Sequence, residues 1–189
     1  MLRKRVLLLI GSPGVGKTTV LLKIVEALKA NGYTVGGMIS REVRSGGSRV
    51  GFEIMDLSSS KTGWLAHVEQ EGGPQVGKYR VNMKGLDGIG VKAVLQAIAL
   101  SDAVVIDEIG PMELFSDEFK RAVREAAEST KLVVGIVHWK ARSRLMDEIK
   151  SREDVEMHVV TFDNREKMGD VVTEEALGFL KTTRRNKVL

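Results

Sequence analysis

A glycine-rich stretch near the N-terminus, GSPGVGKTT, carries the residues best suited to binding a polyphosphate. Its spacing fits the pattern G-x-x-x-x-G-K-[ST], in which glycines let the loop fold back and point backbone N–H groups at phosphate oxygens. The helix predicted to follow adds the positive end of its dipole. Lys17 is placed to neutralise the β- and γ-phosphates, and the Thr18 hydroxyl to ligate Mg²⁺. The predicted phosphate-binding residues are Gly11, Ser12, Pro13, Gly14, Val15, Gly16, Lys17, Thr18 and Thr19.

A second motif, VVIDE at Val104–Glu108, is an apolar strand that ends in two acids. Asp107 is expected at the carboxyl edge of the sheet, where its carboxylate can hold the Mg²⁺ that Thr18 also ligates. Glu108 lies next to that acid and can orient a water molecule or accept its proton. Glu113 competes for this role, because the turn at 109–111 can bring it back toward the site. The predicted catalytic residues are therefore Lys17, Asp107, Glu108 and Glu113, with Thr18 and Asp107 as metal ligands.

The elements that must position these motifs alternate between strands and helices, which predicts an α/β fold with a mostly parallel, doubly wound sheet and helices on both faces. A segment of about 40 residues, 40–80, has no helical pattern and is longer than an ordinary connection, so we expect a small antiparallel β insert there. We interpret residues 1–189 as one domain. The expected strands are Val6–Ile10, Thr34–Ile39, Ala103–Ile106, Leu132–Val137 and Val155–Val160; the expected helices are Thr18–Ala30, Leu86–Leu100, Asp117–Glu128, Ser143–Ser151 and Thr173–Leu180.

The order of the strands can be predicted from the second motif. A strand acid followed by Glu is typical of phosphate-loop proteins with an added strand between the loop strand and the acid strand. By that analogy Leu132–Val137 lies between Val6–Ile10 and Val104–Asp107. His138 then either senses the γ-phosphate or simply ends the strand.

Composition narrows the classes of protein and of partner. The chain is 43% hydrophobic and 29% charged, as in globular proteins with a full core, and it has no cysteine, which excludes disulfides, thiolate metal sites and a cysteine nucleophile. The absence of cysteine favours the cytoplasm. The apolar run that ends at Ile10 is too short for export, and no stretch approaches the roughly 20 residues that span a bilayer. Part of the net charge of +4 comes from Lys181–Lys187, which we interpret as a frayed end rather than a nucleic-acid arm. We expect no membrane or nucleic-acid partner and a monomer, although no motif defines the oligomeric state.

Five segments in order, GSPGVGKTT, ISREVRSGGSRVGFEIMDL, KYRVN, VVIDEIGPMELFS and VTFDNRE, give the chain a resemblance to a known family. It resembles the nucleoside-triphosphatase family of thermophilic archaea and bacteria that includes the cancer-related nucleoside-triphosphatase of animals, within the P-loop NTPase superfamily. The resemblance implies slow, Mg²⁺-dependent hydrolysis of nucleoside 5′-triphosphates (ATP, GTP and others) to diphosphate and phosphate, with broad base specificity.

The resemblance also implies nucleotide-binding positions. Gly11–Thr18 resembles the first nucleotide-binding segment of the family, and Asn164 and Arg165 resemble its base-side element, where a guanidinium can stack on a base of any identity. The second segment comprises Val104, Val105, Ile106, Asp107, Glu108, Ile109, Gly110 and Pro111.

Two other functions use the same loop. A nucleotide or nucleoside kinase would pass the phosphoryl group to an acceptor, and a nucleotide-gated switch or assembly factor would use hydrolysis only to reset a partner interaction. A basic turn with Arg41, Arg44 and Arg49 could supply a cation to the transferring phosphoryl group or could be ordinary surface charge. A kinase should also have a lid that excludes water, and no helical lid segment is evident.

Overall fold

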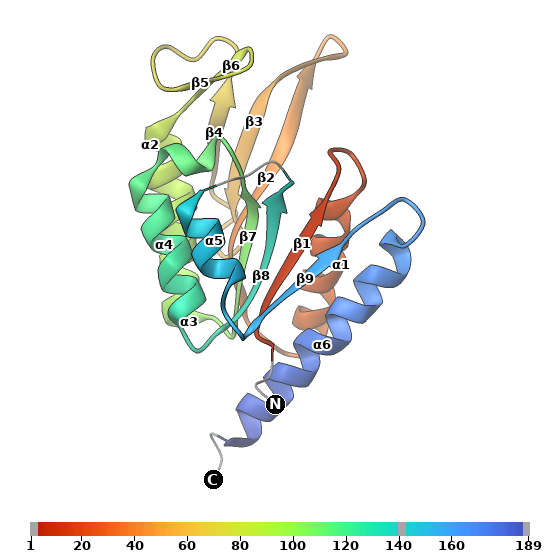
Figure 1. Cartoon of the computed structure of the whole chain (residues 1–189). Coiled ribbons are helices and arrows are strands. Elements are labelled where there is room, and N and C mark those ends of the chain that lie inside the picture. The colour runs from red at the N-terminus through yellow and green to blue at the C-terminus, as the bar shows by residue number, and fades with distance from the viewer. Residues whose placement is uncertain (1–3, 140–142, 187–189) are drawn as a thin grey trace.

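A continuous sheet of nine strands runs through the described part of the chain, residues 4–139 and 143–186 of a computed structural model (Figure 1). The strand order is β5-β6-β4-β3-β2-β7-β8-β1-β9. Pairs within β2-β7-β8-β1-β9 are parallel, and pairs within β2-β3-β4-β6-β5 are antiparallel. The strands are β1 (Val6–Gly11), β2 (Val35–Ser45), β3 (Ser48–Asp56), β4 (Thr62–His67), β5 (Gln75–Val76), β6 (Tyr79–Val81), β7 (Ala103–Ile109), β8 (Leu132–His138) and β9 (Val155–Val159).

Helices cover both faces of the parallel half, α1 and α6 on one face and α3, α4 and α5 on the other (Figure 1). Side chains of β1 alternate accordingly, because Leu7 and Leu9 pack in the core with α1 and α6, whereas Val6 and Leu8 pack in the core with α3, α4 and α5. The helices are α1 (Lys17–Ala30), α2 (Met83–Gly85), the π-helical η1 (Leu86–Val91), α3 (Lys92–Leu100), the 3₁₀ turn η2 (Glu113–Phe115), α4 (Asp117–Glu128), α5 (Arg144–Lys150) and α6 (Arg165–Asn186). The predicted doubly wound α/β fold is confirmed.

The predicted strand order around the site is also confirmed. Strand β8 lies between β1 and β7, and its Gly135 pairs with Leu8 on one side and with Ile106 on the other. The carboxyl ends of β1, β7 and β8 therefore meet at one edge of the sheet, where the loop after β1 and the acids of β7 both lie.

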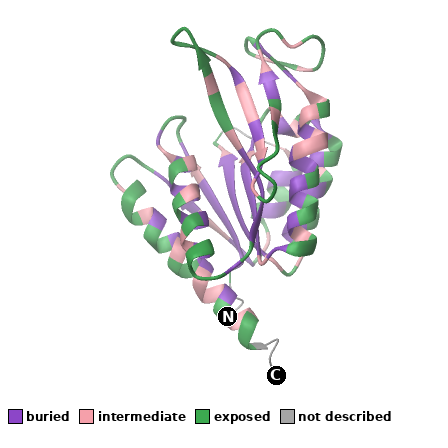
Figure 2. Cartoon of the chain, turned by 180° about the vertical axis from the view of Figure 1, so that it is seen from behind, coloured by how far each residue is buried: buried purple, intermediate pink, exposed green. Residues whose placement is uncertain are grey.

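The strands of the 40–80 region extend the main sheet rather than forming a separate layer. They pair antiparallel beyond β2, and the β2–β3 hairpin projects past the edge where the parallel strands end (Figure 1). This hairpin is largely exposed toward its tip, whereas the parallel strands are buried (Figure 2). The hairpin therefore borders the candidate site, and its tip is exposed to solvent.

Three predictions about the helical segments and the end of the chain were wrong. Helix α6 begins at Arg165 instead of Thr173, and the predicted helix over Leu86–Leu100 starts as the π-helical η1. The basic end of the chain is helical up to Asn186 rather than frayed, and Lys187 lies outside the described residues. Arg184 anchors this end, since it donates to the Gly32 carbonyl (3.0 Å) and lies 4.6 Å from the Tyr33 ring centroid. No helix among the described residues is long and apolar enough to cross a membrane.

Candidate functional site

The loop between β1 and α1 has the conformation that its glycines predict. Gly14 (φ 76°) and Gly16 (φ 103°) are left-handed, a region that side chains with a Cβ disfavour. Gly11 permits a close approach, because a Cβ there would lie 2.4 Å from the Val160 carbonyl oxygen. Buried Val15 anchors the loop, whereas Ser12, Pro13 and Gly14 are exposed. The loop is therefore held at both ends and open to a ligand in its middle.

Lys17, the first residue of α1, reaches back across this loop. Its Nζ donates to the carbonyl oxygens of Gly11 (2.9 Å) and Ser12 (3.1 Å), and the residue is only 9% exposed. The ammonium is thus already held at the mouth of the loop, where a phosphate chain would lie.

Asp107 faces this loop from the end of β7. Its carboxyl is buried, and Oδ2 has no hydrogen-bond partner among the described residues. Burial raises the pKa of Asp107 to about 7; the Thr18 hydroxyl, the Lys17 ammonium and the Ser40 backbone N–H oppose the rise, and the charge of Glu108 adds to it. An orphaned carboxylate oxygen beside a threonine hydroxyl is a suitable ligand pair for a small hard cation such as Mg²⁺.

Two further carboxyl groups converge on Gly110. The Gly110 N–H donates to Oε2 of Glu113 (3.1 Å), and a Cβ at Gly110 would lie 3.0 Å from Oε1 of Glu108 and 3.0 Å from Oε2 of Glu113. A Cβ here would require both carboxyl groups to shift by a few tenths of an ångström. The regular pairing of β7 with β8 breaks between Ile106 and Ile109, and the Asp107–Glu108 peptide bond is cis. The contacts at Gly110 bring Glu108 and Glu113 together, and both lie close enough to Asp107 for their charges to interact with it.

The environments of these two glutamates differ. Burial, together with the charges of Glu108 and Asp107, raises the pKa of Glu113 to about 8. Burial also raises the pKa of Glu108, while the charges of His138 and Lys17 lower it. Glu108 is half-buried and Glu113 is buried, so Glu108 is the more accessible of the two to a water molecule.

His138 ends β8 between the two halves of the site. It pairs with Gly11 of β1, and a Cβ at Gly110 would lie 3.4 Å from the His138 Cβ. This position is compatible with both roles expected for His138, sensor or strand end.

The loop from β9 to α6 flanks the phosphate-binding loop. A Cβ at Gly16 would lie 3.4 Å from Cδ of Arg165, and the Arg165 guanidinium is 5.8 Å from the exposed ring of Phe162. The amide of Asn164 is occupied within its own turn, since it accepts from the Thr161 N–H (2.8 Å) and donates to the Val159 carbonyl (2.9 Å). Arg165 and Phe162 thus present the planar groups, while Asn164 fixes the turn that carries them.

The remaining residues of the predicted second segment have supporting positions. Ile109 and Gly110 are buried in the turn after Glu108, and Pro111 is exposed. Val104, Val105 and Ile106 are buried in the two cores and bring β7 to Asp107. Thr19 is exposed on the first turn of α1.

The three arginines of the basic turn all have carboxylate partners on the β2–β3 hairpin. Arg41 pairs with Glu53, while Arg44 and Arg49 both pair with Glu42. They are therefore not a cluster of unpaired cations, and they differ in their distance from the sheet edge.

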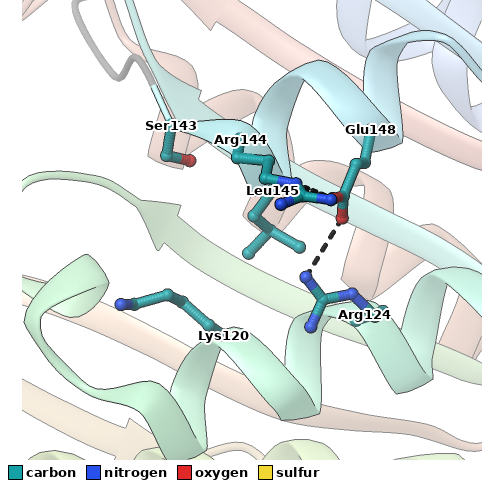
Figure 3. A pocket seen from close by; sticks show the side chains of 6 residues that line it. All are labelled: Lys120, Arg124, Ser143, Arg144, Leu145 and Glu148. Carbon is teal, nitrogen blue, oxygen red and sulfur yellow. Dashed lines mark hydrogen bonds and ion pairs between the residues drawn. The ribbon is translucent and has the colours of Figure 1, made fainter.

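A separate groove lies between α4 and α5 (Figure 3). It has a volume of about 490 Å³, and Glu148 bridges Arg124 (3.0 Å) and Arg144 (2.9 Å) across it. Its described lining, Lys120, Arg124, Ser143, Arg144, Leu145 and Glu148, includes none of the predicted site residues.

Sequence reasoning missed two residues of this region. Ser40 contributes a backbone N–H to Asp107, and Phe162 exposes its ring beside Arg165. Ser40 directly follows the predicted strand Thr34–Ile39, and Phe162 lies two residues before Asn164. Both residues follow a predicted strand at the carboxyl edge of the sheet, and this position could have identified them as site residues.

Comparisons with known proteins agree with this geometry. A family model described as NTPase matches residues 6–173. The nucleoside-triphosphatase THEP1 of Thermofilum pendens is 47% identical over 160 residues, which cover 84% of this chain and 88% of the relative. That of Methanothermobacter thermautotrophicus is 43% identical over 162 residues, covering 86% and 90%.

Two solved structures are also similar. The crystal structure of THEP1 from the hyperthermophile Aquifex aeolicus has a TM-score of 0.76 and 28% identity, and the match covers 92% of this chain and 98% of that one. The solution structure of a human cancer-related nucleoside triphosphatase has a TM-score of 0.75 and 36% identity, covering 89% and 96%.

Proposed function

Because the chain belongs to this NTPase family, we propose that it is a single P-loop domain that hydrolyses nucleoside 5′-triphosphates to diphosphate and phosphate with Mg²⁺. The observation that carries the proposal is the orphaned, buried Oδ2 of Asp107, which lies across β8 from the phosphate-binding loop. A buried carboxylate oxygen without a partner is costly, and a bound cation would compensate for that cost.

The phosphate chain lies on the backbone N–H groups of the loop and at the amino end of α1 in this proposal. Lys17 moves little on binding, since its Nζ is already at the loop mouth, and it offsets charge on the β- and γ-phosphates. Thr18 and Asp107 would hold Mg²⁺, which neutralises charge on the phosphate oxygens when bound.

Glu108 orients the attacking water and accepts its proton. It is half-buried, it adjoins the metal-binding acid, and it is more accessible than Glu113. Glu113 is the alternative base, and in this proposal it supports the position of Glu108 through their common contact with Gly110.

Broad base specificity follows from the way in which the base would be held. Arg165 lies against Gly16 with an exposed aromatic ring beside it, and planar stacking does not distinguish purines from pyrimidines. Asn164 is proposed to act here through the turn that it fixes.

The test is a phosphate-release screen over purine and pyrimidine triphosphates, with Mg²⁺ present or chelated, comparing the wild type with Lys17→Ala. We expect release from both base classes, loss on chelation, and loss in Lys17→Ala. No release from any triphosphate would contradict the proposal. Using labelled ATP with a mixture of nucleosides and monophosphates, label that enters an acceptor faster than free phosphate would favour the kinase instead.

A further inference from the structure

Strand β2 brings its outer half directly beside the acids of β7. Its parallel pairing with β7 ends at Met38, opposite Ile106, and β2 then continues as one arm of the hairpin. Ser40 therefore lies two positions beyond that last pair, as Glu108 does on β7, and its backbone N–H acts to lower the pKa of Asp107. Arg41, the next residue, lies two positions beyond Asp107 by the same register.

The alternation of β2 directs Arg41 to the side of the phosphate-binding loop. Met38 packs in the core with α3 and α4, whereas Ile39 packs in the core with α1. Arg41 is two residues beyond Ile39 and so shares the face of α1, the helix that begins with Lys17 and Thr18. Its side chain is 64% exposed, so it is free of packing that would prevent a rotamer change.

One carboxylate holds Arg41 in this position. Glu53 lies directly opposite on β3, and the Arg41 Nε donates to Glu53 Oε2 at 2.5 Å. The guanidinium uses only that one oxygen, with Nη2 on the same atom. Glu53 is 21% exposed, but the Arg41 side of the pair lies largely in solvent, which weakens the pair, so a phosphate group can displace the carboxylate.

The other two arginines, Arg44 and Arg49, lie too far from the acids of β7 to take this role. Arg44 is three residues beyond Arg41, about 10 Å along an extended strand, and Arg49 is the pairing partner of Arg44. Arg49 is also held by the Tyr79 hydroxyl (2.8 Å) and lies over the Phe52 ring. Arg44 is thus a matched control for Arg41, on the same hairpin and with the same kind of partner.

We propose that Arg41 is a catalytic residue that contacts the γ-phosphoryl group and stabilises the charge developing on it, releasing Glu53 to do so. The inference rests on the proposed hydrolysis. Water oxygen bonds to the γ-phosphorus, the bond from that phosphorus to the β–γ bridging oxygen breaks, and the water proton goes to Glu108. Arg41 forms no covalent bond, and its charge acts most strongly where the phosphoryl oxygens are most negative.

The experiment compares Arg41→Ala, Arg41→Lys and Arg44→Ala in the full chain. We expect Arg41→Ala to lower kcat by about 10²-fold or more, Arg41→Lys to recover part of the loss, and Arg44→Ala to stay within about threefold of wild type. Added guanidinium should partly restore Arg41→Ala. Circular dichroism spectra should coincide, because both variants remove contacts of the hairpin alone: the ion pair of Arg41 with Glu53, or the ion pair of Arg44 with Glu42 and its bond to the Gly47 carbonyl.

A binding measurement separates a catalytic from a structural role. Arg41→Ala should bind a non-hydrolysable triphosphate as the wild type does, but should bind nucleoside diphosphate with aluminium fluoride and Mg²⁺ at least tenfold more weakly, because that complex mimics the transition state. Equal losses for both ligands, or equal kcat values for Arg41→Ala and Arg44→Ala, would overturn the inference while leaving the hydrolysis intact. A wild type that releases no phosphate would instead refute the proposed function itself.

Discussion

The phosphate-binding loop and the end of β7 face each other across β8, and they present their polar groups in opposite ways. The loop uses backbone N–H groups and one ammonium that is already hydrogen-bonded to Gly11 and Ser12. The end of β7 and the turn after it present three carboxyl groups, and burial raises the pKa of each one. The loop therefore already holds its ammonium in place for an anion, whereas the buried acids would be stabilised by a cation.

The largest effect should come from the single side chain on which the loop depends. Lys17→Ala removes a cation and both of its bonds to loop carbonyls, so triphosphate affinity and turnover should fall together, with kcat/KM lower by about 10³-fold. Nucleotide titration and phosphate release measure the two effects. Lys23→Ala is the control, because this α1 lysine is exposed and pairs only with residues of α6. A normal rate in Lys17→Ala would show that the backbone alone holds the phosphates.

A substitution among the acids should behave differently: it should lower the rate of hydrolysis but leave the affinity for triphosphate unchanged. Glu108→Gln keeps the shape of the side chain but removes its basicity, so kcat should fall about 10²-fold while the affinity for triphosphate stays within about threefold. Single-turnover phosphate release and equilibrium titration give the two quantities. Retained turnover would move the base to Glu113.

Gly110 tests whether the two glutamates act as a unit. In Gly110→Ala the new methyl group would meet both carboxyl groups at 3.0 Å, so one of them must move, and we expect kcat to fall about tenfold with affinity unchanged. Gly88→Ala is the matched control, because a Cβ there has no neighbour within 4 Å. Equal kcat values for the two variants would show that the spacing of Glu108 and Glu113 is not critical.

The last prediction concerns stability rather than rate. Glu113 has an ordinary pKa of 4.5 when exposed and about 8 when folded, so the ligand-free protein binds more protons folded than unfolded between these values. Its stability should then fall as pH rises from about 5 to 8, because the folded protein loses the proton of Glu113 across this window. Glu113→Gln lacks this contribution and keeps an acceptor for the Gly110 N–H. Urea unfolding at several pH values should show a difference between the two proteins that changes across this window; a constant difference would contradict the shift.

The loop, the acid strand and their order in the sheet were predictable because each has a strong local cause. The glycine spacing requires left-handed residues, and the apolar run of β7 ends where its acids begin. The insertion of β8 between β1 and β7 followed from analogy and is confirmed.

Other features depend on tertiary contacts that a sequence pattern does not record. The start of α6 was missed because 165–170 is mostly polar, and the segment is fixed by contacts such as the Lys23 to Asp170 ion pair. The π-helical η1 contains Gly90, where a Cβ would lie 2.5 Å from Cδ1 of Ile54, so the packing of β3 decides it. The convergence of Glu108 and Glu113 on Gly110 likewise appears only once the turn is folded.

The central place of β8 has a mechanical consequence. Two strand spacings of about 4.8 Å each separate the backbones of β1 and β7. The distance between the phosphate-binding loop and the acids of β7 is therefore set by the backbone hydrogen bonds of the sheet and not by any side chain of the site. Gly135 lies at the middle of that ladder, where a Cβ would come within 3.3 Å of Leu8 and 3.4 Å of the Ile106 carbonyl oxygen. A bulkier residue at this buried position would contact both flanking strands, so a single substitution far from the ligand would act on both halves of the site.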